Sequence, residues 1–505
     1  MINQIKLNNN FNIAQNTPIS VSKAQNGVSS PISSKTLSYP QGCKPSSIGV
    51  NTTLTQSESE KYLALVNALK NQPVSENSFN TSATKQLDCL LKNGKLLAKS
   101  NNDNSTTLDN LYNILTKPRC EDFNPLAVLS NTLDILVNPR IITQNFGDIP
   151  KDEEAKILSE LPKDSPLQMS PETMDIQASA VCAAASNEVN LADKYPAEFA
   201  RWVEGLSSEN KAVYSDIWLD SISKNKLDAI TILNLMDAKK VDFNLDKVKI
   251  KISPDGNAYK RAKIQEKHWD KGERNLVDVL IQSTIMQLGS QNTYDSLTDT
   301  RGGIFSDNTE GLIEIEKTFV ESVIKNKEVT SLVYQKIDDN QNLVGYNCSF
   351  DKMEKHIKDT IDSGDDVIIG NVLTNETSGM LDSGTYDPKV NGEPNKIING
   401  HEITIVGYDI DKDGKTVFRC IDTDDDSPDF VYYSADYLLP KLHHAGYPAQ
   451  IVEKDEKEIM SNVAWILIWK LTEKNGKNKR RHPDSNWGIR ALQAPALPLG
   501  HVALY

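Results

Sequence analysis

The chain has 505 residues, 38% of them hydrophobic and 25% charged, and its formal net charge at pH 7 is −14. This length allows two or three domains, and the negative charge argues against nucleic acid or an anionic membrane surface as the main partner. The longest apolar run, 463–469, is too short to cross a bilayer. Because the N-terminus lacks a basic segment followed by an apolar one, we expect a cytoplasmic protein, although secretion without a signal peptide stays open.

Residues 1–57 are rich in Asn, Ser, Thr, Gln and Pro and contain few large apolar side chains. Such a segment cannot bury enough surface to offset its chain entropy, so we predict that it is disordered. Residues 58–165 form an N-terminal helical region, which we interpret as an autoinhibitory pro-region or a targeting domain. Its apolar residues follow a helical period, with helices expected at 62–69, 84–98, 106–116, 125–137 and 152–160.

Residues 166–471 begin with helical patterns and end with strand patterns. We predict helices over 195–204, 207–224, 226–238, 275–288 and 309–325, and a hairpin with its first strand at 248–252 and its turn at 254–257. The strands follow at 331–336, 343–348, 366–373, 402–408, 415–421, 430–433 and 463–470, with a short helix at 434–442. Helices first and strands afterwards indicate an α+β fold with a cleft between two halves.

The last residues, 472–505, contain a basic run and show no hydrophobic period. This tail resembles the peptide strings that arise when a bacterial reading frame runs into a transfer-RNA gene. We interpret it as an unstructured translation artefact, and it has no place in the predicted fold.

A histidine and a carboxylate stand at the two ends of one predicted hairpin. His401 precedes the strand 402–408, the turn 411–414 reads Asp-Lys-Asp-Gly, and Asp422 follows the strand 415–421. The open ends of paired strands lie side by side, so the Asp422 carboxylate can accept a hydrogen bond from the Nδ1–H of His401. That bond would fix the tautomer and stabilise the imidazolium, as in the orienting half of a nucleophilic triad.

A candidate nucleophile lies upstream of the hairpin. The pattern of 180–189 predicts the start of a helix with Ser179 as its N-cap, which puts Cys182 in the first turn. There the helix dipole and the free backbone N–H groups favour a thiolate. Gln177, five residues before the cysteine, carries an amide that can help to bind an oxyanion. The alternative is that Cys182 is a small buried residue on an apolar helix.

In their order along the chain, these residues resemble the papain-like cysteine peptidase superfamily, in which the cysteine opens a central helix and the histidine and an Asn or Asp follow on strands. The resemblance spans 166–471 and implies a papain-like α+β fold, with a helical half opened by the Cys helix and an antiparallel, β-barrel-like half. It also implies a protein or peptide substrate and no cofactor. The roles that it implies are nucleophile for Cys182, base for His401, orienting residue for Asp422 and oxyanion donor for Gln177.

The calpain and bacteriocin-processing branches are similar to a lesser degree. They too carry Gly-His before a strand, and residues 286–297 resemble the Gly-Ser-Tyr stretch between the cysteine and the histidine of calpains. The chain departs from the family pattern at three points. Alanines replace the Gly and Trp around the cysteine, Gln177 stands five residues before it where papain and calpain have six, and Asp422 replaces the commoner Asn.

Three activities are compatible with these residues. Cleavage of peptide bonds is the expected one, but the same triad serves acyl transfer in transglutaminase- and deamidase-type enzymes. The third is binding by a catalytically inactive protein that keeps the papain fold. The sequence does not set the oligomeric state.

No metal site is expected. Asp409, Asp411 and Asp413 match the start of a calcium loop, but its twelfth position is Cys420, where a bidentate Glu is required. We therefore predict a hairpin turn there and a solvated acidic loop at 422–426. The six cysteines form no CxxC pair, which indicates neither a zinc site nor a disulfide framework.

The pair His443-His444 is also not interpreted as a metal site. It follows the predicted helix 434–442, and adjacent residues on a helix face apart. We expect both side chains at the surface, at the end of that helix.

Overall fold

The structure, a computed structural model, describes part of the chain, and all of the described residues belong to one compact unit, 39–505. The described residues are 52–73, 81–147, 149–161, 179–218, 247–302, 311–337, 342–374, 389–390, 393–394, 397–424, 429–455 and 459. The C-terminal tail and most of the segment predicted to be disordered lie outside them. The first helix begins at Gln56, two residues inside that segment.

The N-terminal helical region contains helices where the sequence predicts them. They are α1 (Gln56–Leu69), α2 (Ala83–Lys92), α3 (Thr107–Thr116), α4 (Pro125–Val137) and α5 (Lys151–Glu160). At the start of α3 the Thr106 hydroxyl accepts a hydrogen bond from the Asp109 N–H at 3.0 Å, and the Asp109 carboxylate accepts one from the Thr106 N–H at 2.9 Å. The predicted helix 84–98 ends early because Gly94 has a φ of 78°, and a 3-10 turn, Lys95–Leu97, follows it.

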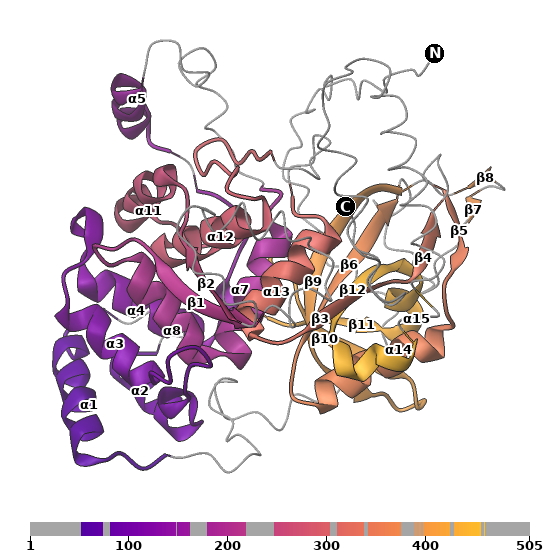
Figure 1. The fold of residues 1–505 in the computed structure, drawn as a ribbon, viewed down its shortest axis with the longest axis horizontal. Helices are drawn as coiled ribbons and strands as arrows, with labels where there is room; N and C mark the ends of the chain where they lie inside the picture. The colour runs from indigo at the N-terminus through magenta and orange to yellow at the C-terminus, as the bar shows by residue number, and fades with distance from the viewer. Residues whose placement is uncertain are drawn as a thin grey trace. The chain divides into compact units, whose positions relative to one another are not determined.

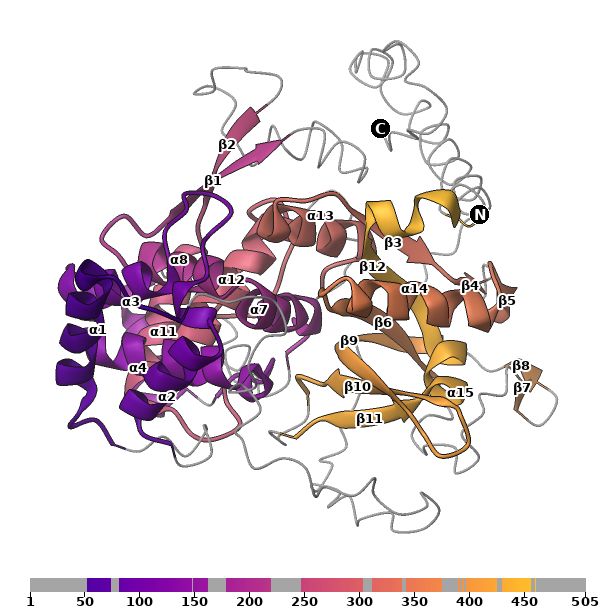
Figure 2. The ribbon, with the colours of Figure 1, turned by 90° about the horizontal axis from the view of Figure 1, so that it is seen from below.

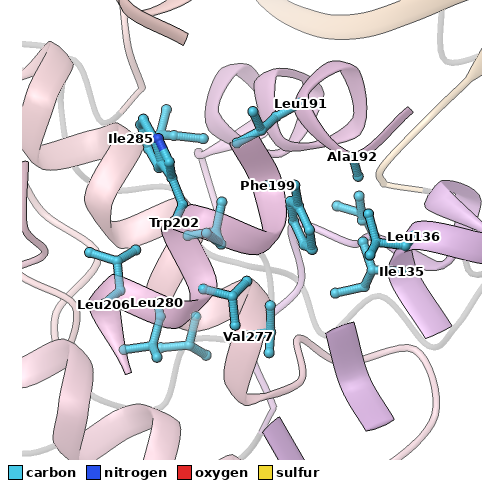
Figure 3. Close-up of a cluster of buried hydrophobic side chains, with 14 of the residues drawn as sticks. Ile135, Leu136, Leu191, Ala192, Phe199, Trp202, Leu206, Val277, Leu280 and Ile285 are labelled. Carbon is cyan, nitrogen blue, oxygen red and sulfur yellow. The ribbon is translucent and has the colours of Figure 1, made fainter. Parts of the chain in front are cut away.

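Helices α1 to α4 share one hydrophobic core with helices that follow the candidate nucleophile. The later helices are α7 (Cys182–Lys194), α8 (Pro196–Leu206), α11 (Gly256–His268), α12 (Leu276–Gly289) and α13 (Glu314–Lys325). Figure 3 shows side chains of α4, α7, α8 and α12 gathered in this core, which includes the fully buried Phe199 and Trp202. None of the described helices combines the length and the apolar character that spanning a bilayer requires.

One predicted helix is wrong. The sequence predicts a helix over 207–224, but Val213–Trp218 form strand β1, which pairs antiparallel with β2 (Lys247–Ile252). Residues 213–216 alternate between buried and more exposed side chains, a period of two that fits a strand. The predicted helix 226–238 lies outside the described residues.

Two predicted elements differ from the structure in smaller ways. The predicted turn 254–257 is the start of α11, because the Asp255 carboxylate accepts a hydrogen bond from the N–H two residues later, at 2.9 Å. The predicted helix 434–442 consists of α15 (Ala435–Leu438) and a 3-10 turn (Leu439–Lys441), after which the chain enters a strand.

The C-terminal half is built on an antiparallel sheet, so the chain has the predicted α+β class. The sheet has the strand order β11-β10-β9-β6-β12-β3. Its strands are β3 (Val329–Val333), β6 (Val367–Thr374), β9 (Ile397–Ile410), β10 (Thr416–Ile421), β11 (Val431–Ser434) and β12 (Leu442–Pro448). Short two-stranded ladders join β4 (Gln335–Ile337) to β5 (Leu343–Tyr346) and β7 (Lys389–Val390) to β8 (Glu393–Pro394). The predicted strand at 463–470 lies outside the described residues.

The large sheet is open within the described part of the chain, whereas the sequence analysis expected a barrel-like half. Strands β11 and β3 are its two edges and are separated by four other strands, so no hydrogen bonds close it. Helices cover its faces, as Figures 1 and 2 show.

The two faces of β9 meet different partners. Glu402 and Thr404 point toward α7 and α13, where they contact Ser186 and Lys317. Ile403 and Ile405 join a second hydrophobic core, together with side chains of α14 (Phe350–Asp362), a helix that the sequence analysis missed. Strand β9 therefore connects the helical half to the core beneath the sheet.

Candidate active site

His401 lies inside strand β9, and not at its start as predicted. The strand begins four residues earlier, at Ile397, because β6 continues to pair with it, and Asn371 of β6 lies opposite His401. Pairing on this side holds the backbone of His401 within the sheet. The side chain of His401 is 14% exposed.

The predicted hairpin brings Asp422 to His401. Strand β10 ends at Ile421, and the turn before it is held by Asp411, whose carboxylate accepts hydrogen bonds from two backbone N–H groups at 2.9 and 2.8 Å. The turn ends with Gly414 at a φ of 79°, as its Asp-Gly sequence predicts. Asp422 follows β10 directly, and its Oδ1 lies 2.7 Å from the Nε2 of His401.

The ring nitrogen that contacts Asp422 differs from the expected one. The sequence analysis assigned the bond to Nδ1, but Nε2 makes it. Ile421 pairs with Thr404, so Asp422 does not stand directly opposite His401, and the outer nitrogen of the ring reaches it. Because imidazole has two nitrogens, this bond leaves Nδ1 free of Asp422.

Cys182 is the first residue of α7, two residues after the predicted start of the helix. Val181 is the N-cap, and its side chain makes no cap hydrogen bond. Ser179, which was the predicted N-cap, donates to the carboxylate of Asp299 at 2.5 Å. Its hydroxyl oxygen accepts a hydrogen bond from Arg274 at 2.7 Å in place of a backbone N–H, so Ser179 does not cap the helix. The Cys182 side chain is half-buried, and the N–H groups of the first turn lack intrahelical acceptors.

His401 interacts with the side chain of Cys182 as well as with Asp422, and both interactions act on its pKa. Burial alone would lower the pKa of His401, but the hydrogen bonds to Asp422 and to Cys182, and the charges of both, raise it to about 11. The imidazole therefore keeps its proton at neutral pH, beside the Asp422 carboxylate and the sulfur of Cys182. Three of the four predicted site residues lie together, and Gln177 lies outside the described residues.

A second His–Asp pair, His356 and Asp455, differs from the pair of His401 and Asp422 in what its other ring nitrogen contacts. In the C-terminal half, His356 Nε2 lies 3.0 Å from Asp455 Oδ2, but its Nδ1 lies 2.9 Å from the Tyr334 hydroxyl. Burial lowers the pKa of His356, and the hydrogen bond to Asp455 only partly offsets that effect. Both nitrogens of His356 are occupied within the core, so this pair has no thiol to serve.

The sequence analysis missed a buried charged cluster beside His401. Glu402 Oε2 accepts a hydrogen bond from Lys317 Nζ at 3.1 Å, and Glu402 Oε1 lies 2.7 Å from His444 Nε2. Burial would raise the pKa of Glu402, but Lys317 and His444 hold it well below its usual range. His444 lies in the sheet over Gly370, where a Cβ would stand 2.1 Å from the imidazole. The cluster supports the strand that carries His401.

The expected surface position of His443 and His444 is therefore wrong. Both lie in strand β12, and their Nδ1 atoms are 2.9 Å apart. Burial lowers the pKa of His443 to about 4. Residues 442–448 show no alternation of apolar and polar side chains, and nothing local in the sequence indicates the buried partner of a histidine.

The other cysteines have different surroundings. Burial raises the pKa of the Cys120 thiol to about 11 and that of Cys420 well above its usual range. Cys89 is disulfide-bonded, which the spacing of the cysteines did not predict. Within the described residues, no group of three or more His, Cys, Asp or Glu side chains is arranged to hold a metal ion.

Comparisons with known proteins do not identify a family. No family model matches the chain, and no curated protein matches it significantly. Among solved structures the chain is similar to the SERA5 proenzyme from Plasmodium falciparum, with 11% identity over 77% of this chain and 95% of that one and a TM-score of 0.18. A TM-score of this size does not establish a shared fold.

Proposed function

We propose that the protein is a papain-like thiol hydrolase that cleaves peptide bonds in protein or peptide substrates. The observation that supports this most is that His401 is hydrogen-bonded to Asp422 and also interacts with the side chain of Cys182. Each of the three residues comes from a different place in the fold: the start of a helix, the middle of a strand and the end of its hairpin partner. Such a grouping suits a nucleophile, a proton carrier and an orienting acid.

In the proposed reaction, the Cys182 thiolate attacks the carbonyl carbon of the peptide bond, and a C–S bond forms while the carbonyl oxygen takes the electron pair. The backbone N–H of Cys182, at the start of α7, donates to this oxyanion. Gln177 is the proposed second donor. His401 gives its proton to the departing amine as the C–N bond breaks, which leaves a thioester.

Deacylation reverses the direction of proton transfer. Water attacks the thioester carbon, and His401, now neutral, takes a proton from that water. The C–S bond breaks, the carboxylic acid leaves, and the thiolate and the imidazolium are restored. Throughout the cycle Asp422 keeps Nε2 occupied and the imidazole oriented, so the proton is exchanged at Nδ1.

The test applies an epoxysuccinate-type thiol-peptidase inhibitor to the full chain, maps the labelled residue by mass spectrometry and measures the cleavage of an unfolded protein such as casein. We expect labelling at Cys182 and cleavage that Cys182→Ser abolishes. Incorporation of a primary amine into casein in place of cleavage would make the protein an acyl transferase. If Cys182 stays unlabelled and neither reaction occurs, the protein is a binding protein that lacks catalysis.

A further inference from the structure

Residues 142–147, here called the strap, lie between α4 and α5 of the N-terminal helical region and run through the interior without regular secondary structure. Thr143, Gln144 and Phe146 are only 4%, 6% and 4% exposed. An irregular segment so deeply enclosed needs partners for its backbone groups. Those partners lie at both ends of the candidate site.

On one side the strap holds the residues that follow Asp422. The Gln144 N–H and the Thr143 hydroxyl both donate to the Thr423 carbonyl, at 3.0 and 3.1 Å. The Gln144 amide donates to Asp424 Oδ1 at 3.1 Å and accepts from the Thr423 hydroxyl at 3.2 Å. The Asp424 N–H in turn donates to Asp422 Oδ1, at 3.2 Å. Four hydrogen bonds from two strap residues thus fix the loop on which Asp422 stands.

On the other side the strap is tied to the chain that leads into the nucleophile. The Nη2 of Arg274 donates to the Gln144 carbonyl at 2.6 Å and to the Ser179 hydroxyl at 2.7 Å. Ser179 precedes Cys182 by three residues. The guanidinium of Arg274 also lies over the ring of Phe146, 3.6 Å from its centroid, and Arg274 is fully buried. One arginine therefore links the strap to the start of α7.

We propose that Gln144 is a positioning residue for Asp422, and that the helical region which precedes the nucleophile is for this reason a permanent part of the site and is not removed on activation. The proposal rests on the function proposed above. Its basis is that the side chain of Gln144 accepts a hydrogen bond from the hydroxyl of Thr423, which is fully buried, and donates one to the exposed carboxylate of Asp424. Without the amide of Gln144 the Thr423 hydroxyl would be buried and unpaired, which favours a displaced loop and, with it, a displaced Asp422.

The shared hydrophobic core leads to the same conclusion. Leu136 of α4 is fully buried, and the helix packs against α7, α8 and α12 (Figure 3). Ile421, the residue before Asp422, belongs to this core and not to the core beneath the sheet. Loss of the N-terminal helices would uncover the apolar side of α7 and of the Asp422 loop together.

The test compares Gln144→Met with Gln86→Met in the full chain. Gln86 is a matched control: it is a fully buried glutamine of the same helical region, its amide donates to Asp134 Oδ1 at 2.6 Å, and its partner lies far from Asp422 in the sequence. The measurement is the rate of Cys182 alkylation by iodoacetamide against pH. The alkaline inflection of this profile reports the pH at which His401 loses its proton.

We expect Gln144→Met to move the alkaline inflection by about one unit toward lower pH, because a displaced Asp422 no longer supports the imidazolium. Gln86→Met should leave it in place. Identical profiles for Gln144→Met and the wild type, or an equal shift in Gln86→Met, would overturn the positioning role. If Gln144→Met does not fold, Thr143→Val removes one bond to Thr423 without changing shape, and a smaller shift of the same sign is expected.

These profiles need no substrate, so they separate this inference from the proposed function. A protein that cleaves no peptide but shows the shift in Gln144→Met keeps the positioning role and loses the peptidase function. A protein that cleaves peptides but whose alkaline inflection is unmoved in Gln144→Met keeps the peptidase function and loses the positioning role. The second part of the proposal, that the helical region is not removed on activation, is tested by native mass spectrometry of inhibitor-labelled wild-type protein. Residues 56–147 should be present in the labelled species. Labelled protein that lacks them would overturn that part.

Discussion

The hydroxyl of Ser186 donates a hydrogen bond to the backbone carbonyl of Glu402, at 3.2 Å. Ser186 lies four residues after Cys182, about one helical turn, and Glu402 follows His401 directly. The Thr404 hydroxyl returns a bond to the Ser186 carbonyl at 3.3 Å. The helix that carries Cys182 is thus joined to the strand that carries His401 within about one helical turn of Cys182 and three residues of His401.

Ser186→Ala and Thr404→Val should each lower the free energy of unfolding by about 0.5–1.5 kcal/mol, since each removes one hydrogen bond. Both should also slow the reaction of Cys182 with iodoacetamide by roughly tenfold, because small errors in the separation of reacting groups are costly. Thr132→Val is the control. It removes a buried hydroxyl that bonds within α4, at 2.6 Å from the Val128 carbonyl, and should leave the Cys182 rate unchanged.

His401→Ala should slow the alkylation of Cys182 at pH 6 by on the order of tenfold or more, because the thiolate loses the imidazolium beside it. In peptide cleavage the loss in kcat/KM should be roughly 10²–10⁴-fold. His356→Ala is the control, because His356 also has an aspartate partner but its second nitrogen faces Tyr334. It should leave the alkylation rate of Cys182 unchanged. Equal alkylation rates for the wild type and His401→Ala would show that His401 and Cys182 do not act together.

Asp422→Asn should change the pH dependence of stability in a defined window. The pKa of His401 is raised in the folded protein from 6.5 to about 11, so its contribution to stability is fully present below about pH 6.5 and is lost as the pH rises through about 11. Urea unfolding between pH 6 and 11 should therefore show a difference between wild type and Asp422→Asn that shrinks as the pH rises. A difference that is constant over this range would contradict the raised pKa.

Lys317→Met should lower the free energy of unfolding by about 3–5 kcal/mol, because it leaves the Glu402 carboxylate buried with one partner fewer. The double variant with Glu402→Gln should lose less than the sum of the two single changes. Arg301→Met serves as the control. It breaks the bidentate, fully buried ion pair between Arg301 and Glu316, which lies next to Lys317 in α13. Arg301→Met should lower the free energy of unfolding by a similar amount, and its effect should add to that of Glu402→Gln. If the effects of Lys317→Met and Glu402→Gln were also additive, the Lys317–Glu402 ion pair would be refuted.

Leu136→Ala should lower the free energy of unfolding by roughly 2–5 kcal/mol, the cost of a cavity in the core that Figure 3 shows. Because the N-terminal helices share this core with α7, we expect one cooperative transition in which the reactivity of Cys182 and the helical circular dichroism change together. Two separate transitions, with the Cys182 site surviving the first, would mean that the N-terminal helices form a domain of their own.

Residues close together in the chain determined what could be predicted. The start of a helix at Cys182, to within two residues, and the hairpin that ends at Asp422 follow from caps, turns and hydrophobic period. The Asp-Lys-Asp-Gly turn was predicted for the same reason. These features depend on neighbours a few positions away, and so the sequence contains them.

The tertiary structure alone decided the rest. Thr143 and Thr423 are 280 positions apart, and Lys317 and Glu402 are 85 apart. The ring nitrogen that faces Asp422, the charged cluster beside His401 and the strap behind the site all depend on such distant pairs. A polar residue is buried only when folding brings a partner to it, and no local period or composition records which partner that is.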